Sequence, residues 1–148
     1  MTGPEALTKD YMVIRLIGFS MISILFVCWA LTQFVHLPGK TSQDAIVWIR
    51  CLLYLIAAAS FATIVFLKKI FLQKNPQDNL STLITKLKMS AIITFGICET
   101  PGIYGLVLYF IGGSRTDFYV LAVYSLVLFA IFYPRINQWE EHVASAAA

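Results

Sequence analysis

Apolar residues in this chain gather into four long stretches, separated by shorter polar segments. The stretches cover about residues 13–37, 45–67, 89–111 and 118–133. Each has roughly the 20 residues that a helix needs to cross the hydrocarbon core of a bilayer. The short alternating segments of a transmembrane β-barrel do not occur, and a helix satisfies its own backbone hydrogen bonds in lipid. The pattern therefore predicts an all-α protein, an integral membrane four-helix bundle.

The polar segments between the stretches differ in length. The first, "PGKTSQD", and the third, "GGSRTD", are short and turn-like, so each half of the chain is expected to form a helical hairpin. The middle segment is longer, and its part "NLSTLITKLK" predicts a short amphipathic helix ahead of the third stretch. No segment is long enough for a separate soluble domain. We expect a single transmembrane domain over residues 1–148, with a tail at 134–148.

Basic residues lie at the ends of the apolar stretches and are divided unequally between the two sides. One side collects both chain ends and the middle segment, with Lys9, Arg15, Lys68, Lys69, Lys74, Lys86, Lys88 and Arg135. The other side holds Lys40 and Arg115, with Arg50 just inside the second stretch. The positive-inside rule then predicts that both termini, the middle segment and the tail are cytoplasmic. The expected location is the cell membrane, crossed several times, and the inner membrane in a bacterium.

Composition supports lipid as the surrounding medium. The chain is 59% apolar and 13% charged, with a mean hydropathy of +0.76, whereas soluble domains carry about 25% charged residues. The net charge of +3 comes from residues at the ends of the stretches, so it indicates topology and no nucleic-acid partner. The expected partners are the lipid bilayer and either a second copy, as a homo-oligomer, or a larger membrane complex. Trp139 is expected on the cytoplasmic surface.

Residues that usually carry catalysis or hold cofactors are sparse. Cys28, Cys51 and Cys98 all lie in apolar stretches without a CxxC spacing, which is typical of buried cysteines. His36 and His142 belong to opposite sides of the membrane and cannot bind one haem together. The sequence has no nucleotide-binding motif and no nucleophile–base–acid set. We expect no enzyme activity, no cofactor and no metal.

One carboxylate interrupts the third apolar stretch. In "ITFGICETPGIYGLVLYF", residues 93–110, Glu99 lies about ten residues into the stretch and so near the bilayer midplane. A charged carboxylate at this depth costs at least about 3 kcal/mol. Such a group stays protonated, pairs with a cation, or faces water or a bound ion. Arg50 is a candidate cation on the second stretch, and it either pairs with Glu99 or extends to the outer surface.

Helical spacing gives Glu99 two alternative roles. Pro101 cannot donate to the carbonyl of Ile97, which leaves that acceptor free one turn away. With Thr100 and Tyr104, this carbonyl and the carboxylate make a candidate site for a proton or a small cation. In the alternative, Glu99 hydrogen-bonds to a neighbouring helix and fixes the packing of the bundle. Close helix packing is expected at Gly96, Pro101, Gly102 and Gly105.

The stretch "CETPGIYGLVLYF", residues 98–110, resembles the carboxylate-bearing helix of the proteolipids, or c subunits, of rotary ATPases. The resemblance extends to the hairpin of the second and third stretches, whose connection is polar and cytoplasmic by the charge count. It implies that Glu99 is the carboxylate that binds the transported ion. The chain departs from that family because its second stretch lacks regularly spaced glycines and because the carboxylate lies in the third of four stretches.

Three functions are compatible with these observations. The first is a small, non-catalytic accessory or structural subunit that packs within the bilayer, with Glu99 giving packing specificity. The second is a proteolipid-like component that binds and translocates a proton or a sodium ion through Glu99. The third is a binder of a hydrophobic small molecule. An ion handler needs Glu99 to face a cavity, lipid or a partner, whereas a packing role needs Glu99 to be satisfied inside the bundle.

Overall fold

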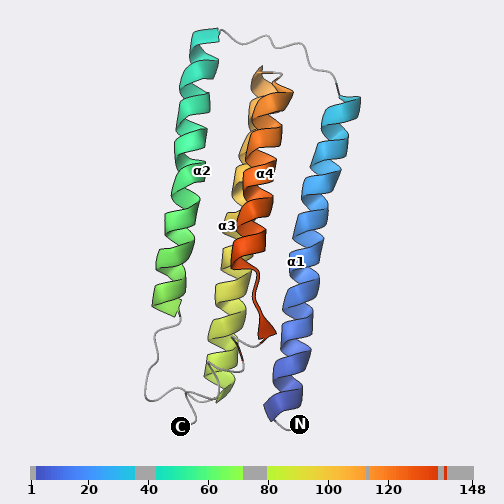
Figure 1. Ribbon diagram of the computed structural model, residues 1–148, viewed down its shortest axis with the longest axis vertical. Coiled ribbons are helices and arrows are strands. Elements are labelled where there is room, and N and C mark those ends of the chain that lie inside the picture. The colour runs from blue at the N-terminus through green and yellow to red at the C-terminus, as the bar shows by residue number, and fades with distance from the viewer. Residues whose placement is uncertain (1–2, 36–42, 72–79, 113, 137–138, 140–148) are drawn as a thin grey trace.

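The computed structural model describes residues 3–35, 43–71, 80–112, 114–136 and 139 (Figure 1). In these residues the chain forms four helices and no strands: α1 (Gly3–Phe34), α2 (Gln43–Phe71), α3 (Leu80–Gly112) and α4 (Arg115–Phe132). All four helices are long and apolar enough to cross a membrane. The predicted all-α fold is confirmed, and its four candidate spans indicate a multi-pass membrane protein.

All four helices are longer than the stretches that predict them. α3 has 33 residues and a length of about 50 Å, well beyond the roughly 30 Å of a hydrocarbon core. The segment "NLSTLITKLK" is not a separate helix, because from Leu80 onward it is the beginning of α3. α4 is the shortest of the four, with 18 residues and a length of about 27 Å. Residues 72–79, most of the first predicted turn and most of the tail lie outside the described residues.

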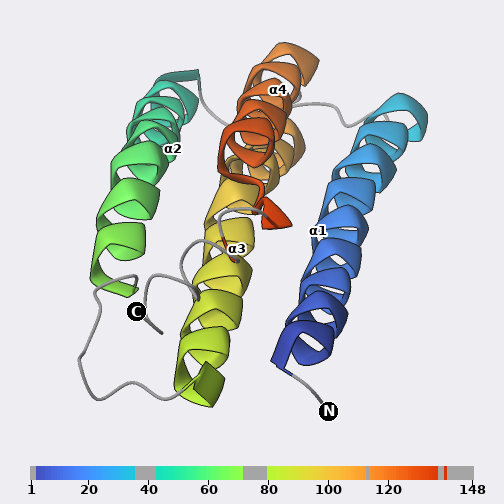
Figure 2. The same ribbon diagram turned by 60° about the horizontal axis from the view of Figure 1, so that its bottom comes forward.

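α3 and α4 form the centre of the bundle, and α1 and α2 lie on opposite sides of them (Figures 1 and 2). α3 packs against each of the other three helices, whereas α1 and α2 barely contact each other. The close approach of α3 and α4 depends on Gly105, where a Cβ atom would lie only 3.0 Å from the Cα atom of Phe118. α3 and α4 therefore form a helical hairpin, as expected. α1 and α2 do not form the second expected hairpin, because they barely contact each other.

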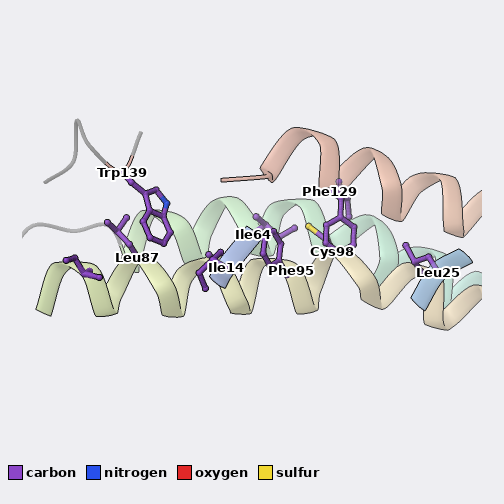
Figure 3. Packing of buried hydrophobic residues seen from close by; sticks show 11 residues of the cluster. Ile14, Leu25, Ile64, Leu87, Phe95, Cys98, Phe129 and Trp139 are labelled. Atoms are coloured by element: carbon purple, nitrogen blue, oxygen red, sulfur yellow. The ribbon is translucent and has the colours of Figure 1, made fainter. Parts of the chain in front are cut away.

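A cluster of buried side chains joins all four helices (Figure 3). Phe95 of α3 is 1% exposed and reaches both α1 and α4. Its ring centroid lies 5.8 Å from that of Phe129 on α4, and a Cβ atom at Gly18 of α1 would lie 2.9 Å from the Cζ atom of Phe95. Ile64, fully buried, adds α2 to the cluster. The missing side chain at Gly18 is what admits the Phe95 ring.

Trp139, expected on the surface, is instead buried, with 4% of its surface exposed. Its ring meets that of Tyr11 edge to face, with 5.7 Å between the centroids, and it belongs to the same cluster as Leu87 of α3 (Figure 3). The Tyr11 hydroxyl donates a hydrogen bond of 3.2 Å to the carbonyl of Pro134. The described residues after α4 therefore cover apolar surface of α1 and α3 that the shorter α4 does not reach.

Lysine side chains hold helices together at the end of the bundle where α1 and α3 begin. Lys88 of α3 and Asp10 of α1 form an ion pair of 2.7 Å. Lys68, near the end of α2, donates to the carbonyl of Phe132 at 3.4 Å, and its Nζ atom lies 5.1 Å from the centroid of the Phe132 ring. A cation in this place stabilises the last carbonyl groups of α4. These lysines therefore serve packing as well as the charge asymmetry seen in the sequence.

Candidate functional site

Glu99 lies on the side of α3 that faces α1. Residues 95, 99 and 102 share one face of a helix, because they are four and three positions apart. Phe95 packs against Gly18 of α1, and a Cβ atom at Gly102 would overlap Leu25 of α1. Glu99 therefore lies between two contacts of α3 with α1, and only 8% of its surface is exposed.

A hydrogen bond between α3 and α4 sets the depth of Glu99 in the bundle. The hydroxyl of Ser125 donates to the carbonyl of Cys98, the residue before Glu99. Ser125 is the eleventh of the 18 residues of α4, counted from Arg115. Glu99 is therefore level with the middle of the shortest helix.

Glu99 differs from the other two carboxylates whose side chains the structure describes. Asp10 pairs with Lys88 and Asp117 pairs with Arg50, each with 2.7 Å between nitrogen and oxygen. Glu99 has no hydrogen bond or ion pair to another described residue. Its electrostatic interaction is with the thiol of Cys28 on α1. Among the described carboxylates, Glu99 is thus the one whose side chain has no described partner; the residue is largely buried, but its oxygen atoms are not completely enclosed.

Arg50, the cation considered for Glu99, pairs with Asp117 instead. Its Nη2 atom lies 2.7 Å from Oδ2 of Asp117, and the hydroxyl of Tyr54 donates to Oδ1 at 3.2 Å. α2 and α4 begin at the same end of the bundle, so residues near their first turns meet at one depth (Figure 1). Glu99 lies deeper, 13 positions before Gly112, the residue at which α3 ends. Asp117 was missed as a partner because it belongs to the polar segment "GGSRTD".

The other residues of the predicted ion site do not converge on Glu99. The hydroxyl of Thr100 donates to the carbonyl of Gly96 at 2.8 Å, within α3 itself. Ile97 is two positions from Glu99, which places it about 200° around the helix axis. Tyr104 packs against a cluster that joins α2, α3 and α4, formed by Ala57, Leu108 and Leu121. Of the predicted set, the carboxyl group alone remains at this place.

The residues expected at close helix contacts have different surroundings. Gly102 and Gly105 lie against α1 and α4, and Pro101 is fully buried. Gly96 is exposed, and a Cβ atom there would have no neighbouring atom within 4 Å. α3 remains helical through Pro101. Three of the four positions are therefore used for contacts inside the chain, and Gly96 faces the surroundings.

An apolar groove between α1 and α4 is a second candidate site. Its volume is about 310 Å³, and it is lined by Leu25, Phe26, Trp29, Tyr119, Ala122, Val123 and Leu126. The hydroxyl of Tyr119 accepts a hydrogen bond of 2.7 Å from the amide nitrogen of the Gln33 side chain. The groove has no charged lining residue, so any molecule that it holds would be apolar.

Comparisons with protein-family models, with curated proteins and with solved structures give no match. The resemblance of residues 98–110 to the rotary ATPase proteolipids therefore stays a prediction from the sequence. α2 and α3, the two helices to which that resemblance applies, do pack against each other. In the part of the chain that the structure describes, no three His, Cys, Asp or Glu side chains are placed to hold a metal ion together.

Proposed function

We propose that this chain is a small, non-catalytic membrane protein that binds and releases a proton or a sodium ion at Glu99. The contrast between the described carboxylates carries the proposal, because Asp10 and Asp117 are paired and Glu99 is not. A carboxyl group that fixed the packing of the bundle would hydrogen-bond across a helix contact. Glu99 has no such bond to a described residue, so packing alone does not account for a carboxylate at this place.

Because Glu99 is buried, we propose that the change of its charge on binding and release of an ion is what the protein uses. An ionised carboxylate in the hydrocarbon region costs at least about 3 kcal/mol. Binding of a proton or a cation removes that charge, and release restores it. Loading and unloading therefore change the electrostatic energy of the bundle at one defined depth, which is the property that a proteolipid-like ion carrier requires.

An accessory subunit that packs against a second copy or a larger complex is the second proposal. It is favoured by the broad apolar faces that the outer helices turn away from the bundle, including Leu16 (72% exposed), Trp48 (79%) and Leu55 (69%). The two proposals are compatible, since an ion-binding subunit needs a partner that gives the ion a path to water. In both, the distribution of basic residues supports cytoplasmic termini and a location in the cell membrane.

Binding of a hydrophobic small molecule is the third proposal, and it is favoured by the groove between α1 and α4. The volume of the groove, about 310 Å³, is at the lower end of the roughly 300–1,000 Å³ typical of small-molecule sites. Exposed Phe26 and Trp29 form one wall, and their rings offer apolar contact area. Saturable binding of an apolar fluorophore that Val123→Trp abolishes would support this function, and binding unaffected by that change would count against it.

Modification by dicyclohexylcarbodiimide, which reacts with protonated carboxyl groups in apolar surroundings, tests the first proposal. Full-length protein in mild detergent is treated, digested and mapped by mass spectrometry. We expect modification of Glu99 and none of Asp117, a matched control that is also 8% exposed but is paired with Arg50. Glu99→Gln should remove the modification. Folded protein in which Glu99 stays unmodified would contradict ion binding and favour the accessory subunit.

A further inference from the structure

The oxygen atoms around Glu99 decide which ion the site can accept. A sodium ion is a hard cation, and such cations are held by several oxygen ligands at once. In membrane transporters, part of those oxygens are backbone carbonyls of interrupted helices. A proton needs only the carboxylate oxygen to which it binds. The two ions therefore require different surroundings at the same carboxyl group.

Few hydroxyl groups lie near Glu99. Thr100 donates to the carbonyl of Gly96 at 2.8 Å, and its position on α3 is about 100° around the helix axis from Glu99. Ser125 of α4 is closer, because its Oγ atom would lie 3.6 Å from a Cβ atom at Gly102, on the same face of α3 as Glu99, while its hydroxyl donates to the carbonyl of Cys98. One hydroxyl beside the carboxylate does not supply the several oxygen ligands that a sodium ion requires.

Backbone carbonyls are equally unavailable on this face of α3. The helix is continuous from Leu80 to Gly112, so its carbonyl groups accept the usual bonds along the helix. Pro101 removes the donor for one carbonyl, that of Ile97. That residue lies about 200° around the axis from Glu99, on the far side of the helix. The interruption that would expose several carbonyls to an ion is not present.

The facing helix α1 offers carbon and sulfur instead of oxygen. Leu25 packs at Gly102, one turn from Glu99, and Cys28 is the titratable side chain that interacts with Glu99 from α1. A thiol is a soft ligand and a poor one for sodium. On the side of Glu99 that faces α1, these neighbours therefore do not form a set of oxygen ligands for a cation.

Cations on the remaining helices interact with other groups. Lys68 of α2 donates to the carbonyl of Phe132 and interacts electrostatically with Cys98, the residue before Glu99. Arg50 of α2 is paired with Asp117 of α4. In the described residues, neither α2 nor α4 therefore presents a charged side chain that would neutralise Glu99 in place of a bound ion.

We infer that the ion bound by Glu99 is a proton and that the site does not accept sodium. This inference rests on the proposed function and narrows it to proton binding by a single carboxyl group between α1 and α3. Protonation neutralises the carboxylate without a further ligand. It therefore suits a site whose neighbours are Leu25, Cys28 and a continuous helix.

The test compares carbodiimide modification of the full-length protein in sodium chloride and in potassium chloride, at equal ionic strength and across a range of pH. We expect the rate at Glu99 to fall about tenfold per pH unit above its protonation midpoint, equally in both salts. A slower rate in sodium, with the profile displaced to lower pH, would overturn the inference and leave the proposed function intact. Folded protein with no modification at any pH would overturn both.

Thermal unfolding provides a second readout that does not depend on the reagent. Sodium bound to the folded protein would raise its unfolding temperature relative to potassium by mass action. We expect equal unfolding temperatures in the two salts, both for the natural protein and for Glu99→Gln, which keeps the shape of the side chain. A sodium-dependent increase that disappears in Glu99→Gln would overturn the inference.

Discussion

The hydroxyl of Ser125 on α4 donates a hydrogen bond to the backbone carbonyl of Cys98 on α3, and both residues are fully buried. The bond joins the two central helices directly beside Glu99. It fixes the height of α3 against α4, and thereby the depth at which the buried carboxyl group is held. A hydrogen bond of this kind inside a membrane bundle contributes specificity more than strength.

Removing that hydroxyl should cost little but measurable stability. We expect Ser125→Ala to lower the free energy of unfolding by about 0.5–1.5 kcal/mol, the usual range for one hydrogen bond. Ser23→Ala is the matched control, because the exposed Ser23 donates only to the carbonyl of Phe19 in its own helix at 2.9 Å. Unfolding by heat or denaturing detergent measures both. Equal effects of the two changes would contradict a role for the contact between α3 and α4.

Three glycines of α3 should respond differently to the same substitution. At Gly105 an added Cβ atom meets the backbone of Phe118 at 3.0 Å, and at Gly102 it overlaps Leu25, so both changes to alanine should cost about 1–3 kcal/mol. Gly96→Ala meets no atom within 4 Å and gains helix propensity, so it should be neutral or stabilise by up to about 1 kcal/mol. A loss of stability in Gly96→Ala alone would indicate an unseen partner at that face.

The ion pair between Arg50 and Asp117 should be worth more than the one between Lys88 and Asp10. The side chains of Arg50 and Asp117 are 41% and 11% exposed, and those of Lys88 and Asp10 are 36% and 28% exposed, so the difference between the pairs lies in the better enclosure of Asp117. Arg50→Ala leaves a buried carboxylate without its cation, and we expect a loss of about 1–3 kcal/mol. Lys88→Ala should cost less than about 1 kcal/mol.

Carbodiimide modification provides an independent check on the same pair. In Arg50→Ala, we expect Asp117 to be modified, because its carboxyl group has lost the guanidinium group that pairs with it. Natural protein and Lys88→Ala serve as controls in which Asp117 stays unmodified. An Asp117 that remains unmodified in Arg50→Ala would contradict a protective role of the ion pair and leave the hydrogen bond from Tyr54 as its remaining described contact.

Tyr133, the first residue after α4, should make stability depend on alkaline pH. Burial raises the pKa of Tyr133 above its ordinary value of 10.0; the nearby Arg15 opposes this and Tyr11 adds to it. Because the pKa is higher in the folded than in the unfolded state, the stabilisation is complete below about pH 10 and is lost as the pH rises further. The unfolding temperature of Tyr133→Phe should decline less over that range. If the unfolding temperature of Tyr133→Phe declines as much as that of the natural protein, the pH dependence arises from other groups.

The four spans could be predicted because lipid imposes a simple requirement of length and apolar character. Which helices touch could not be predicted, since side chains that face lipid and side chains that face a helix are both apolar. Ile14 and Leu16 illustrate this: two similar residues, two positions apart, are 1% and 72% exposed. The sequence therefore gave no reason to place α1 and α2 on opposite sides of the central hairpin.

The candidate site was predicted in part. Glu99 was found because a carboxylate in an apolar stretch is costly and therefore conspicuous. Its expected ligands were chosen by distance along the chain, although 100° of rotation per residue places Ile97 on another face. The sequence does not indicate Asp117, because it belongs to the polar segment "GGSRTD", which is typical of a turn. In the structure it lies in the first turn of α4 and pairs with Arg50 of α2.

The separation of α1 from α2 also sets an order of assembly. Chains are synthesised from the N-terminus, so α1 and α2 are complete before α3 exists. Because they barely contact each other, the pair gains almost nothing from association at that stage. α3 then packs against both α1 and α2, and α4 packs against α3 to complete the centre of the bundle. A nascent chain that stops before Leu80 would hold two helices that, in the part of the chain that the structure describes, barely contact each other.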